Sequence, residues 1–276
     1  MSKDIDTILD EGNYSSISFL HNCTKDELEP IVKILTDSST SKLDNDSEYL
    51  KHYPDHTKYT YSIIDDYETF GGNTIMNKVR GYGVGYAEIL KDVCKEMKVK
   101  IDKNASLNTM EISLITKITE DAIEKMTPQE LEEFVKGIDP KATVFTKSAV
   151  LMVARTAIKS AGFSAYTLLT KLIYLIGTKI LGKTVPWAVY QGSAKWLGAF
   201  AGPVGLALTS AWTIIDIAGP AYRITIPTTI YIASLRQAKL YEIQNPKCSK
   251  CATPNSKNSK FCSECGNLLG DIKRLN

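Results

Sequence analysis

Residues 248–266, CSKCATPNSKNSKFCSECG, decide the fold at the end of the chain. Cys248 and Cys251 form one Cys-x-x-Cys pair, and Cys262 and Cys265 form a second, directly before a glycine. Each pair can turn two thiolates toward one metal, and two pairs complete a tetrahedron of sulfur ligands. We therefore expect one structural Zn²⁺ in a small β-containing zinc ribbon over residues 244–276, with a redox dithiol pair as the alternative.

The surroundings of the ribbon are basic, although the whole chain is nearly neutral, with 33 Lys and Arg against 31 Asp and Glu. The overall charge therefore predicts no class of partner. Locally, either a solvated surface or a site for an anionic partner, such as nucleic acid or lipid head groups, fits the pattern. The candidate residues for an anionic partner are Lys247, Lys250, Lys257 and Lys260. Residues 244–246, QNP, are typical of a linker that precedes a separate module.

The segment before the ribbon is unusually poor in acidic residues, since Asp216 is the only one between residues 142 and 241. Residues 196–215 contain no charged side chain, and this length is enough to cross a hydrocarbon core. Three glycines and a proline interrupt the run, however, and a water-soluble helical protein can also bury a helix that is apolar on all sides. The sequence leaves both interpretations open.

Asp216 and Arg223 are the candidates for an ion pair within this apolar region. They are seven positions apart, with a Gly-Pro dipeptide between them that would kink a helix. Two buried charges need each other or other partners. A structural ion pair is one interpretation, and a polar pathway inside a membrane bundle is the other.

Helix signals dominate the first half of the chain. Thr24 with Glu27 has the spacing of a capping box. A second helix start is expected at Thr127, Pro128 and Glu130, where threonine can cap and proline suits the first helical position. Apolar residues recur every three to four positions over 49–70, 86–99 and 110–126. The sequence therefore predicts a mainly α protein with an N-terminal helical domain (1–138), an apolar, glycine-rich helical domain (139–243) and the ribbon (244–276).

Composition and motifs favour a cytoplasmic protein that is not an enzyme. Cys23 and Cys94 stand alone outside the ribbon, as in a reducing compartment, and the N-terminus has no secretory pattern. His52 and His56, expected at the surface, join no nucleophile or carboxylate in a catalytic pattern. The glycines of residues 80–86 lack the preceding strand and the following Gly-Lys-Ser/Thr of a phosphate loop, so we expect a turn between helices.

Three segments resemble a known family: residues 70–73 (FGGN), 80–94 (RGYGVGYAEILKDVC) and 216–227 (DIAGPAYRITIP). They are similar to the bacterial YaaW-like family of uncharacterised proteins, over about residues 1–240. The resemblance implies a bacterial cytoplasmic helical protein of unknown activity, and the label ubiquinol-cytochrome c chaperone that some members carry names no chemistry. It implies no catalytic residues, and the ribbon looks like an appended module.

Two functional hypotheses follow from the sequence. The first is a non-enzymatic, membrane-associating protein at the cytoplasmic side of the inner membrane, whose ribbon binds a protein partner or an anionic surface. The alternative is a soluble assembly or chaperone-like factor that buries the same helices and uses the ribbon for protein or nucleic-acid contact. Membrane lipid, a protein bound through the ribbon and nucleic acid are the corresponding partners.

Overall fold

The structure consists of short helices, one long helix near the C-terminus, and the ribbon. The computed structural model describes residues 14–37, 41–71, 84–136, 141–160, 222–251 and 253–269. Its helical elements, in chain order, are η1 (Tyr14–Asn22), α2 (Lys25–Thr36), η2 (Leu43–Asn45), α3 (Ser47–His52), η3 (His56–Lys58), α4 (Thr60–Gly71), α6 (Tyr86–Glu96), α7 (Leu107–Lys125), α8 (Pro128–Lys136), α9 (Lys147–Ser160) and α12 (Tyr222–Gln244).

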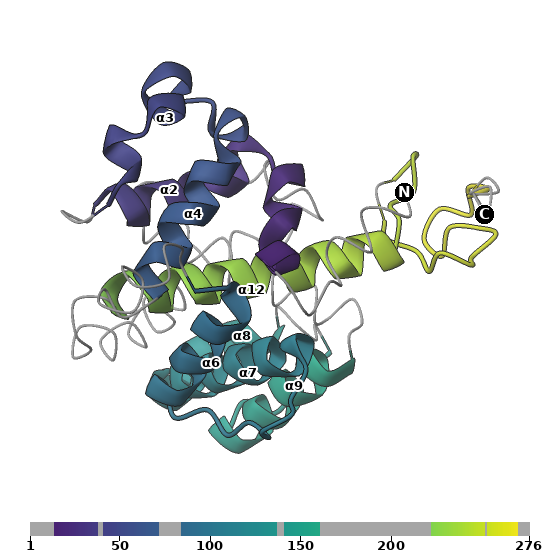
Figure 1. The fold of residues 1–276 in the computed structure, drawn as a ribbon. Helices are drawn as coiled ribbons and strands as arrows, with labels where there is room; N and C mark the ends of the chain where they lie inside the picture. The colour runs from purple at the N-terminus through teal and green to yellow at the C-terminus, as the bar shows by residue number, and fades with distance from the viewer. Residues whose placement is uncertain are drawn as a thin grey trace.

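Helix α12 lies between two groups of helices (Figure 1). It contacts η1, α2 and α4 on one side and α6 and α7 on the other, while α9 packs against α7 and α8. The buried side chains of both groups and of α12 form one continuous hydrophobic core. The expected mainly α fold is confirmed, because the only β structure among the described residues is a pair of isolated bridges in the ribbon.

Both predicted helix starts are capped. Before α2, the Thr24 hydroxyl accepts a hydrogen bond from the Glu27 backbone N–H at 3.3 Å, and the Glu27 carboxylate accepts one from the Thr24 N–H at 2.8 Å. Before α8, the Glu130 carboxylate accepts from the Thr127 N–H at 2.7 Å. These bonds satisfy N–H groups at a helix start that no carbonyl within the helix can reach. Local sequence therefore fixes where both helices begin.

The helical pattern over residues 49–70 forms two helices and not one. Helix α3 ends at His52, and α4 begins only after Pro54 and the short η3. Proline has no backbone donor and disfavours the α conformation in the residue before it, so the helix stops there. The expectation that His56 lies at the surface is wrong. The residue is buried, and its Nδ1 lies against the hydroxyl of Tyr59.

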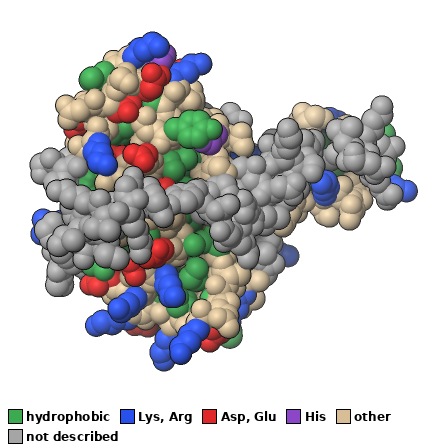
Figure 2. Space-filling model, in the orientation of Figure 1, with side chains coloured by type: hydrophobic (Ala, Val, Ile, Leu, Met, Phe, Trp, Pro, Cys, Tyr) green, Lys and Arg blue, Asp and Glu red, His purple; other side chains and the backbone are tan. Residues whose placement is uncertain are grey.

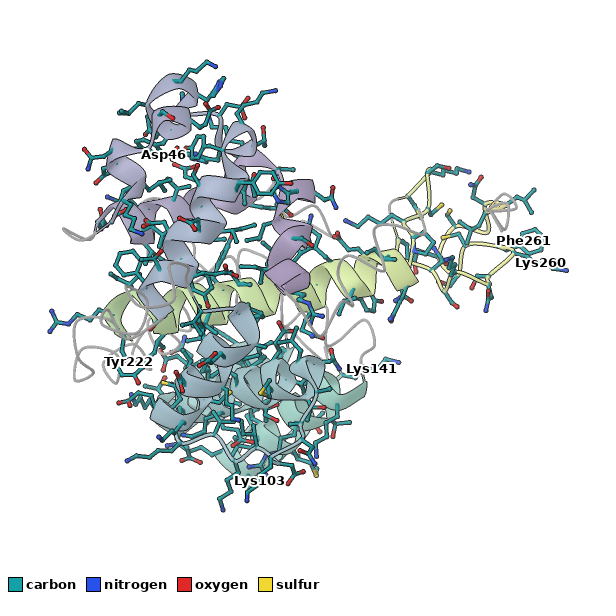
Figure 3. The ribbon with its side chains drawn as sticks, viewed as in Figure 1. Asp46, Lys103, Lys141, Tyr222, Lys260 and Phe261 are labelled. Carbon is teal, nitrogen blue, oxygen red and sulfur yellow. The ribbon has the colours of Figure 1, made fainter. Side chains whose placement is uncertain are left out.

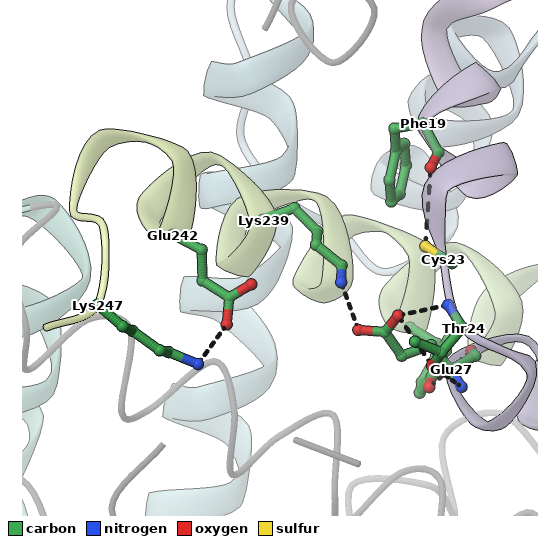
Figure 4. Close-up of polar contacts among 8 residues, drawn as sticks. Phe19, Cys23, Thr24, Glu27, Lys239, Glu242 and Lys247 are labelled. Atoms are coloured by element: carbon green, nitrogen blue, oxygen red, sulfur yellow. Dashed lines mark hydrogen bonds and ion pairs between the residues drawn. The ribbon is translucent and has the colours of Figure 1, made fainter. Parts of the chain in front are cut away.

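Polar contacts connect α12 to the helices on one side of it. Lys239 Nζ lies 2.6 Å from Glu27 Oε1 (Figure 4), and the Tyr231 hydroxyl donates to the Glu27 carbonyl oxygen at 3.0 Å. On α4, the Tyr67 hydroxyl lies 2.8 Å from Thr229 Oγ1. Every residue of α12 from 225 to 238 is buried, so this helix has no solvent-facing stripe.

A buried polar network connects α12 to α6 and α7 on its other side. Glu111 accepts hydrogen bonds from the Tyr86 hydroxyl at 2.8 Å, from Arg236 at 2.8 Å and from Gln237 Nε2 at 2.7 Å. Gln237 Nε2 also lies 2.7 Å from Asn108 Oδ1. Burial raises the pKa of Glu111, and the Arg236 guanidinium opposes that rise. The enclosed pair fixes how α12 is placed against α7.

The expected boundary at residue 139 does not separate two cores in the described part of the chain. Helices α9 and α12 come from the predicted second domain, yet both pack against helices of residues 1–138. A shared core makes these helices one cooperative unit. Residues 161–221 lie outside the described residues, so their relation to this core is not described.

The apolar run at 196–215 and Asp216 also lie outside the described residues. Among the helices that are described, none combines the length and the apolar character needed to cross a membrane. Arg223 is exposed in the first turn of α12. Arg223 is therefore not buried as the prediction of a buried pair requires, whereas its pairing with Asp216 stays a prediction because Asp216 lies outside the described residues.

Candidate metal centre

The ribbon begins at the C-terminal end of α12 and extends beyond the helical groups (Figure 1). Its backbone is bonded to the end of that helix: the Lys257 N–H donates to the Gln244 carbonyl at 3.2 Å, and the Asn255 N–H donates to the Pro246 carbonyl at 3.1 Å. The last carbonyls of a helix lack partners within it, so the ribbon caps α12. Residues 244–246, predicted as a linker, are instead a hydrogen-bonded junction.

The four ribbon cysteines come together as predicted, with their Sγ atoms all within 4.8 Å of one another. Cys248 Sγ lies 3.7 Å from Cys265 Sγ, and Cys251 Sγ lies 3.5 Å from Cys262 Sγ. A tetrahedral Zn²⁺ with Zn–S bonds of about 2.3 Å requires sulfurs about 3.8 Å apart. The donor set and its spacing fit one zinc ion, with no coordination position left for water.

Each Cys-x-x-Cys turn is held by its own backbone. In the first, the Lys250 N–H donates to Cys248 Sγ at 3.4 Å. In the second, the Gly266 N–H donates to the Cys262 carbonyl at 3.0 Å, and Gly266 has a φ of +67°. Glycine adopts this left-handed conformation without steric cost, which explains its position directly after the last ligand.

Asn255 is a buried residue that joins the two turns, and no sequence pattern predicted its role. Its Nδ2 donates to Cys262 Sγ at 3.5 Å and to the Thr253 carbonyl at 2.7 Å, while its Oδ1 accepts from the Ser263 N–H at 2.8 Å. Side chains that bond to metal ligands orient them and tune their basicity. The only sequence signal was an asparagine after a Thr-Pro turn between the cysteine pairs, which is too common to single out.

The shifts in the thiol pKa values fit a centre that holds a cation. The Cys265 backbone N–H lowers the pKa of Cys262 to about 6, and the Cys251 backbone N–H lowers that of Cys248. The Asn267 N–H also lowers the pKa of Cys265, but the sulfurs of its neighbours raise it to about 12. Four thiolates so close together repel one another, and a divalent metal between them removes that repulsion.

The two cysteines outside the ribbon have a different environment. Cys23 and Cys94 are buried in the helical core. Burial raises the pKa of Cys94 to about 12 and also raises that of Cys23. A thiol in apolar surroundings stays protonated and is a poor nucleophile and a poor metal ligand. Metal binding therefore belongs to the ribbon thiols.

The four candidate lysines are exposed on the ribbon, and Lys260 lies near its far end (Figure 3). Lys247 forms an ion pair with Glu242 of α12 at 3.2 Å (Figure 4). Residues 247–269 contain these four lysines and one acidic residue, Glu264. Four thiolates on one Zn²⁺ add two negative charges, so the loaded ribbon is only weakly basic. On the helical groups, basic and acidic side chains are interspersed over the face shown in Figure 2.

Comparison with known proteins agrees with the metal centre and with the family resemblance. A zinc-ribbon domain family matches residues 247–269. A UPF0174 protein of Helicobacter pylori (strain J99 / ATCC 700824) is 36% identical over 196 residues, which cover 71% of this chain and 78% of that protein. A UPF0174 protein of Helicobacter pylori (strain ATCC 700392 / 26695) is 32% identical over 200 residues, covering 70% of this chain and 95% of that protein.

A further relative is the UPF0174 protein YaaW of Escherichia coli (strain K12), which is 28% identical over 234 residues. That alignment covers 82% of this chain and 94% of the relative. No solved structure matches the chain. The resemblance to the YaaW-like family is therefore confirmed, and the chain belongs to the UPF0174 family of bacterial proteins and ends in a zinc ribbon.

Proposed function

We propose that this protein is a non-enzymatic binding protein in which the helical body carries the zinc ribbon as a contact module for a protein partner. The observation that carries the proposal is an exposed apolar pair. Phe261 and Leu268 face each other across an antiparallel bridge and are 61% and 64% exposed. Figure 3 places Phe261 at the outer part of the ribbon, away from the helical groups.

The pair has the properties of a binding anchor. The bridge and the adjacent metal ligand Cys262 fix the backbone at both residues, so binding has to order only the two side chains. Exposed aromatic side chains on rigid elements are enriched where proteins meet. An exposed phenylalanine beside an exposed leucine on so small a module therefore supports a contact role.

The charges favour a protein over a nucleic acid. Nucleic-acid affinity depends mainly on cations that neutralise phosphates, and the zinc–thiolate core offsets part of the positive charge of the lysines. Nucleic acid would be the expected partner only if the affinity depended on the total number of ribbon lysines. An apolar pair beside a few cations suits a polypeptide better.

Two features support binding and not catalysis. A zinc ion with four thiolate ligands has no open position at which to activate water or a substrate. Glu111 and Arg236, which would otherwise be candidates for acid–base chemistry, are enclosed in the helical core and bonded to each other. Both sites have the arrangement expected for structural roles.

Photo-crosslinking in bacterial cells tests the proposal. A benzophenone amino acid replaces Phe261 in one version and Tyr53 in the control, since Tyr53 is an aromatic residue of similar exposure, 59%, in the other part of the protein. We expect one adduct from position 261 that the control lacks and that Cys262→Ser or Leu268→Ser removes. The adduct partner is identified by mass spectrometry, purified and bound again in vitro. The proposal fails if position 261 gives no adduct beyond those of position 53.

Membrane association at the cytoplasmic face of the inner membrane is a second candidate function. It is supported by the uncharged run at residues 196–215 alone. Flotation with vesicles tests it: Leu206→Arg should release the protein from the membrane, because a charge at the centre of a spanning helix costs about 2.5–3.5 kcal/mol. Wild-type protein that never floats with neutral or anionic vesicles would exclude this function and leave the ribbon proposal untouched.

A further inference from the structure

A small hollow on the ribbon lies beside the exposed apolar pair. It has a volume of about 150 Å³ and is open to solvent. The segments that line it are far apart in the ribbon sequence: the junction after α12, the loop between the two cysteine pairs, and the segment after the last cysteine. Its lining residues include Lys247, Lys257, Ser249, Ser256, Ser259 and Leu268.

We propose that this hollow binds the carboxylate of an acidic peptide segment of the partner, with an apolar neighbour of that carboxylate against Leu268. The inference rests on the proposed function and names the chemistry that the ribbon recognises. Two ammonium groups and three hydroxyls are hydrogen-bond donors, and a carboxylate accepts from both kinds. Leu268 belongs both to the hollow and to the pair with Phe261, so one peptide can contact both.

Four of the donors that line the hollow are available to a ligand. Among the described residues, no side-chain hydrogen bond or ion pair holds Lys257, Ser249, Ser256 or Ser259. At the other side of the hollow, a carboxylate of the chain itself approaches Lys247, since Glu242 Oε1 lies 3.2 Å from its Nζ. Both side chains of that pair are about one-third exposed, at 31% and 33%, so a second carboxylate can compete for the lysine.

The positions of the lysines argue against a nucleic acid in this hollow. Lys247 and Lys257 line it, whereas Lys250 and Lys260 do not. A nucleic-acid backbone would be followed by a row of cations, and the weakly basic loaded ribbon offers only two at this place. In a local carboxylate site, only the lysines that line the hollow should affect the affinity. On a diffuse basic surface, removing any of the four lysines should weaken binding equally, because they carry equal charge.

The test is a titration of the ¹⁵N-labelled, zinc-loaded full chain with the probe acetyl-Leu-Glu-Asp-Leu-amide. The matched probe acetyl-Leu-Gln-Asn-Leu-amide has the same shape without the charges. We expect amide shifts at the residues of the hollow with the acidic probe only. Lys257→Gln should weaken binding about two- to fivefold, the range for one exposed ion pair. Lys250→Gln and Lys260→Gln remove the same charge from the same ribbon and should leave the affinity unchanged.

Three results would overturn the inference: equal binding of both probes, equal weakening by all three lysine variants, or shifts outside the hollow. Tighter binding of a single-stranded 12-mer DNA at the same residues would assign the hollow to nucleic acid and also overturn it. If the probes fail while position 261 still crosslinks to its partner, only this inference fails. If position 261 gives no specific adduct, the proposed function itself is wrong.

Discussion

Glu111 on α7 and Arg236 on α12 form an ion pair at 2.8 Å in which neither side chain has any exposed surface. They are 125 positions apart in the chain. Taking two charges out of water is costly, and the pair compensates for that cost only through good geometry and further hydrogen bonds. Tyr86 and Gln237 provide such bonds to the same carboxylate. The network therefore specifies how α12 fits between the two groups of helices.

Removing one partner should destabilise the fold strongly. We expect Arg236→Leu to lower the free energy of unfolding by about 3–5 kcal/mol, because it leaves the Glu111 carboxylate buried without its cation. Urea titration followed by far-UV circular dichroism measures the change.

The matched control is Lys136→Ala, which breaks an exposed ion pair with Glu132 on α8. That change should stay within about 1 kcal/mol. The double variant Glu111→Leu/Arg236→Leu should recover much of the lost stability, since it removes both buried charges. An Arg236→Leu protein as stable as wild type would show that the network does not hold α12.

Local sequence was enough where a structure depends on neighbours in the chain. Capping at Thr24 and Thr127 needs only the glutamate three positions later, and the metal site needs only four cysteines within one short segment. The helix break at Pro54 could also have been predicted, because proline disfavours a continuous helix. The apolar periodicity on both sides of it led instead to the prediction of one helical segment over residues 49–70.

What depends on distant contacts could not be predicted. Helix α12 is buried all round from residue 225 to residue 238, so the helical periodicity that identifies a surface helix is missing there. For the same reason its membership in the N-terminal core was not visible. The partners of Arg236 and of Asn255 are set by tertiary approach, and no spacing in the sequence encodes either.

Asn255 should control zinc affinity without being a ligand. We expect Asn255→Ala to weaken zinc binding about 10- to 100-fold, the range for residues that orient metal ligands. The loss follows from its contacts with Cys262 Sγ and with the Ser263 N–H, which belong to the second cysteine turn. Competition with a chromogenic chelator measures the affinity. Asn258→Ala, at an exposed position of the same loop, is the control and should bind zinc as wild type does.

Gly71 should be intolerant of a side chain because α4 and α6 approach closely at this residue. A Cβ at Gly71 would lie 2.2 Å from Ile89 Cγ1 and 2.3 Å from its Cδ1. Ile89 is 1% exposed, so it has no space into which to move. We expect Gly71→Ala to cost about 1–3 kcal/mol of stability, the usual range for overpacking, measured by urea unfolding.

A second glycine provides the comparison for Gly71. A Cβ at Gly85, the residue before α6, would meet no atom within 4 Å. Gly85→Ala should therefore cost no more than about 1 kcal/mol, and that cost reflects only the poorer capping by alanine than by glycine at a helix N-cap. If the two variants lose equal stability, steric contact with Ile89 is not the reason for glycine at position 71.

Glu68 on α4 should make the stability depend on pH. Burial, with a smaller contribution from the charge of Asp65, raises its pKa from 4.5 to about 7. Among the described residues, its Oε1 atom has no hydrogen-bond partner. In the unfolded chain the carboxyl ionises near its ordinary pKa, so from about pH 4.5 to 7 the folded protein binds more protons than the unfolded one. The free energy of unfolding therefore decreases as the pH rises through this window.

Replacing this carboxyl with an amide isolates its effect. Glu68→Gln has the shape of the protonated side chain but cannot ionise, so we expect equal stability of the two proteins below about pH 4.5 and a more stable variant above about pH 7. Urea midpoints measured across that range give the comparison. Glu132→Gln, on an exposed side chain of α8, should leave the wild-type profile unchanged. Parallel pH profiles for wild type and Glu68→Gln would mean that folding does not raise the pKa of Glu68.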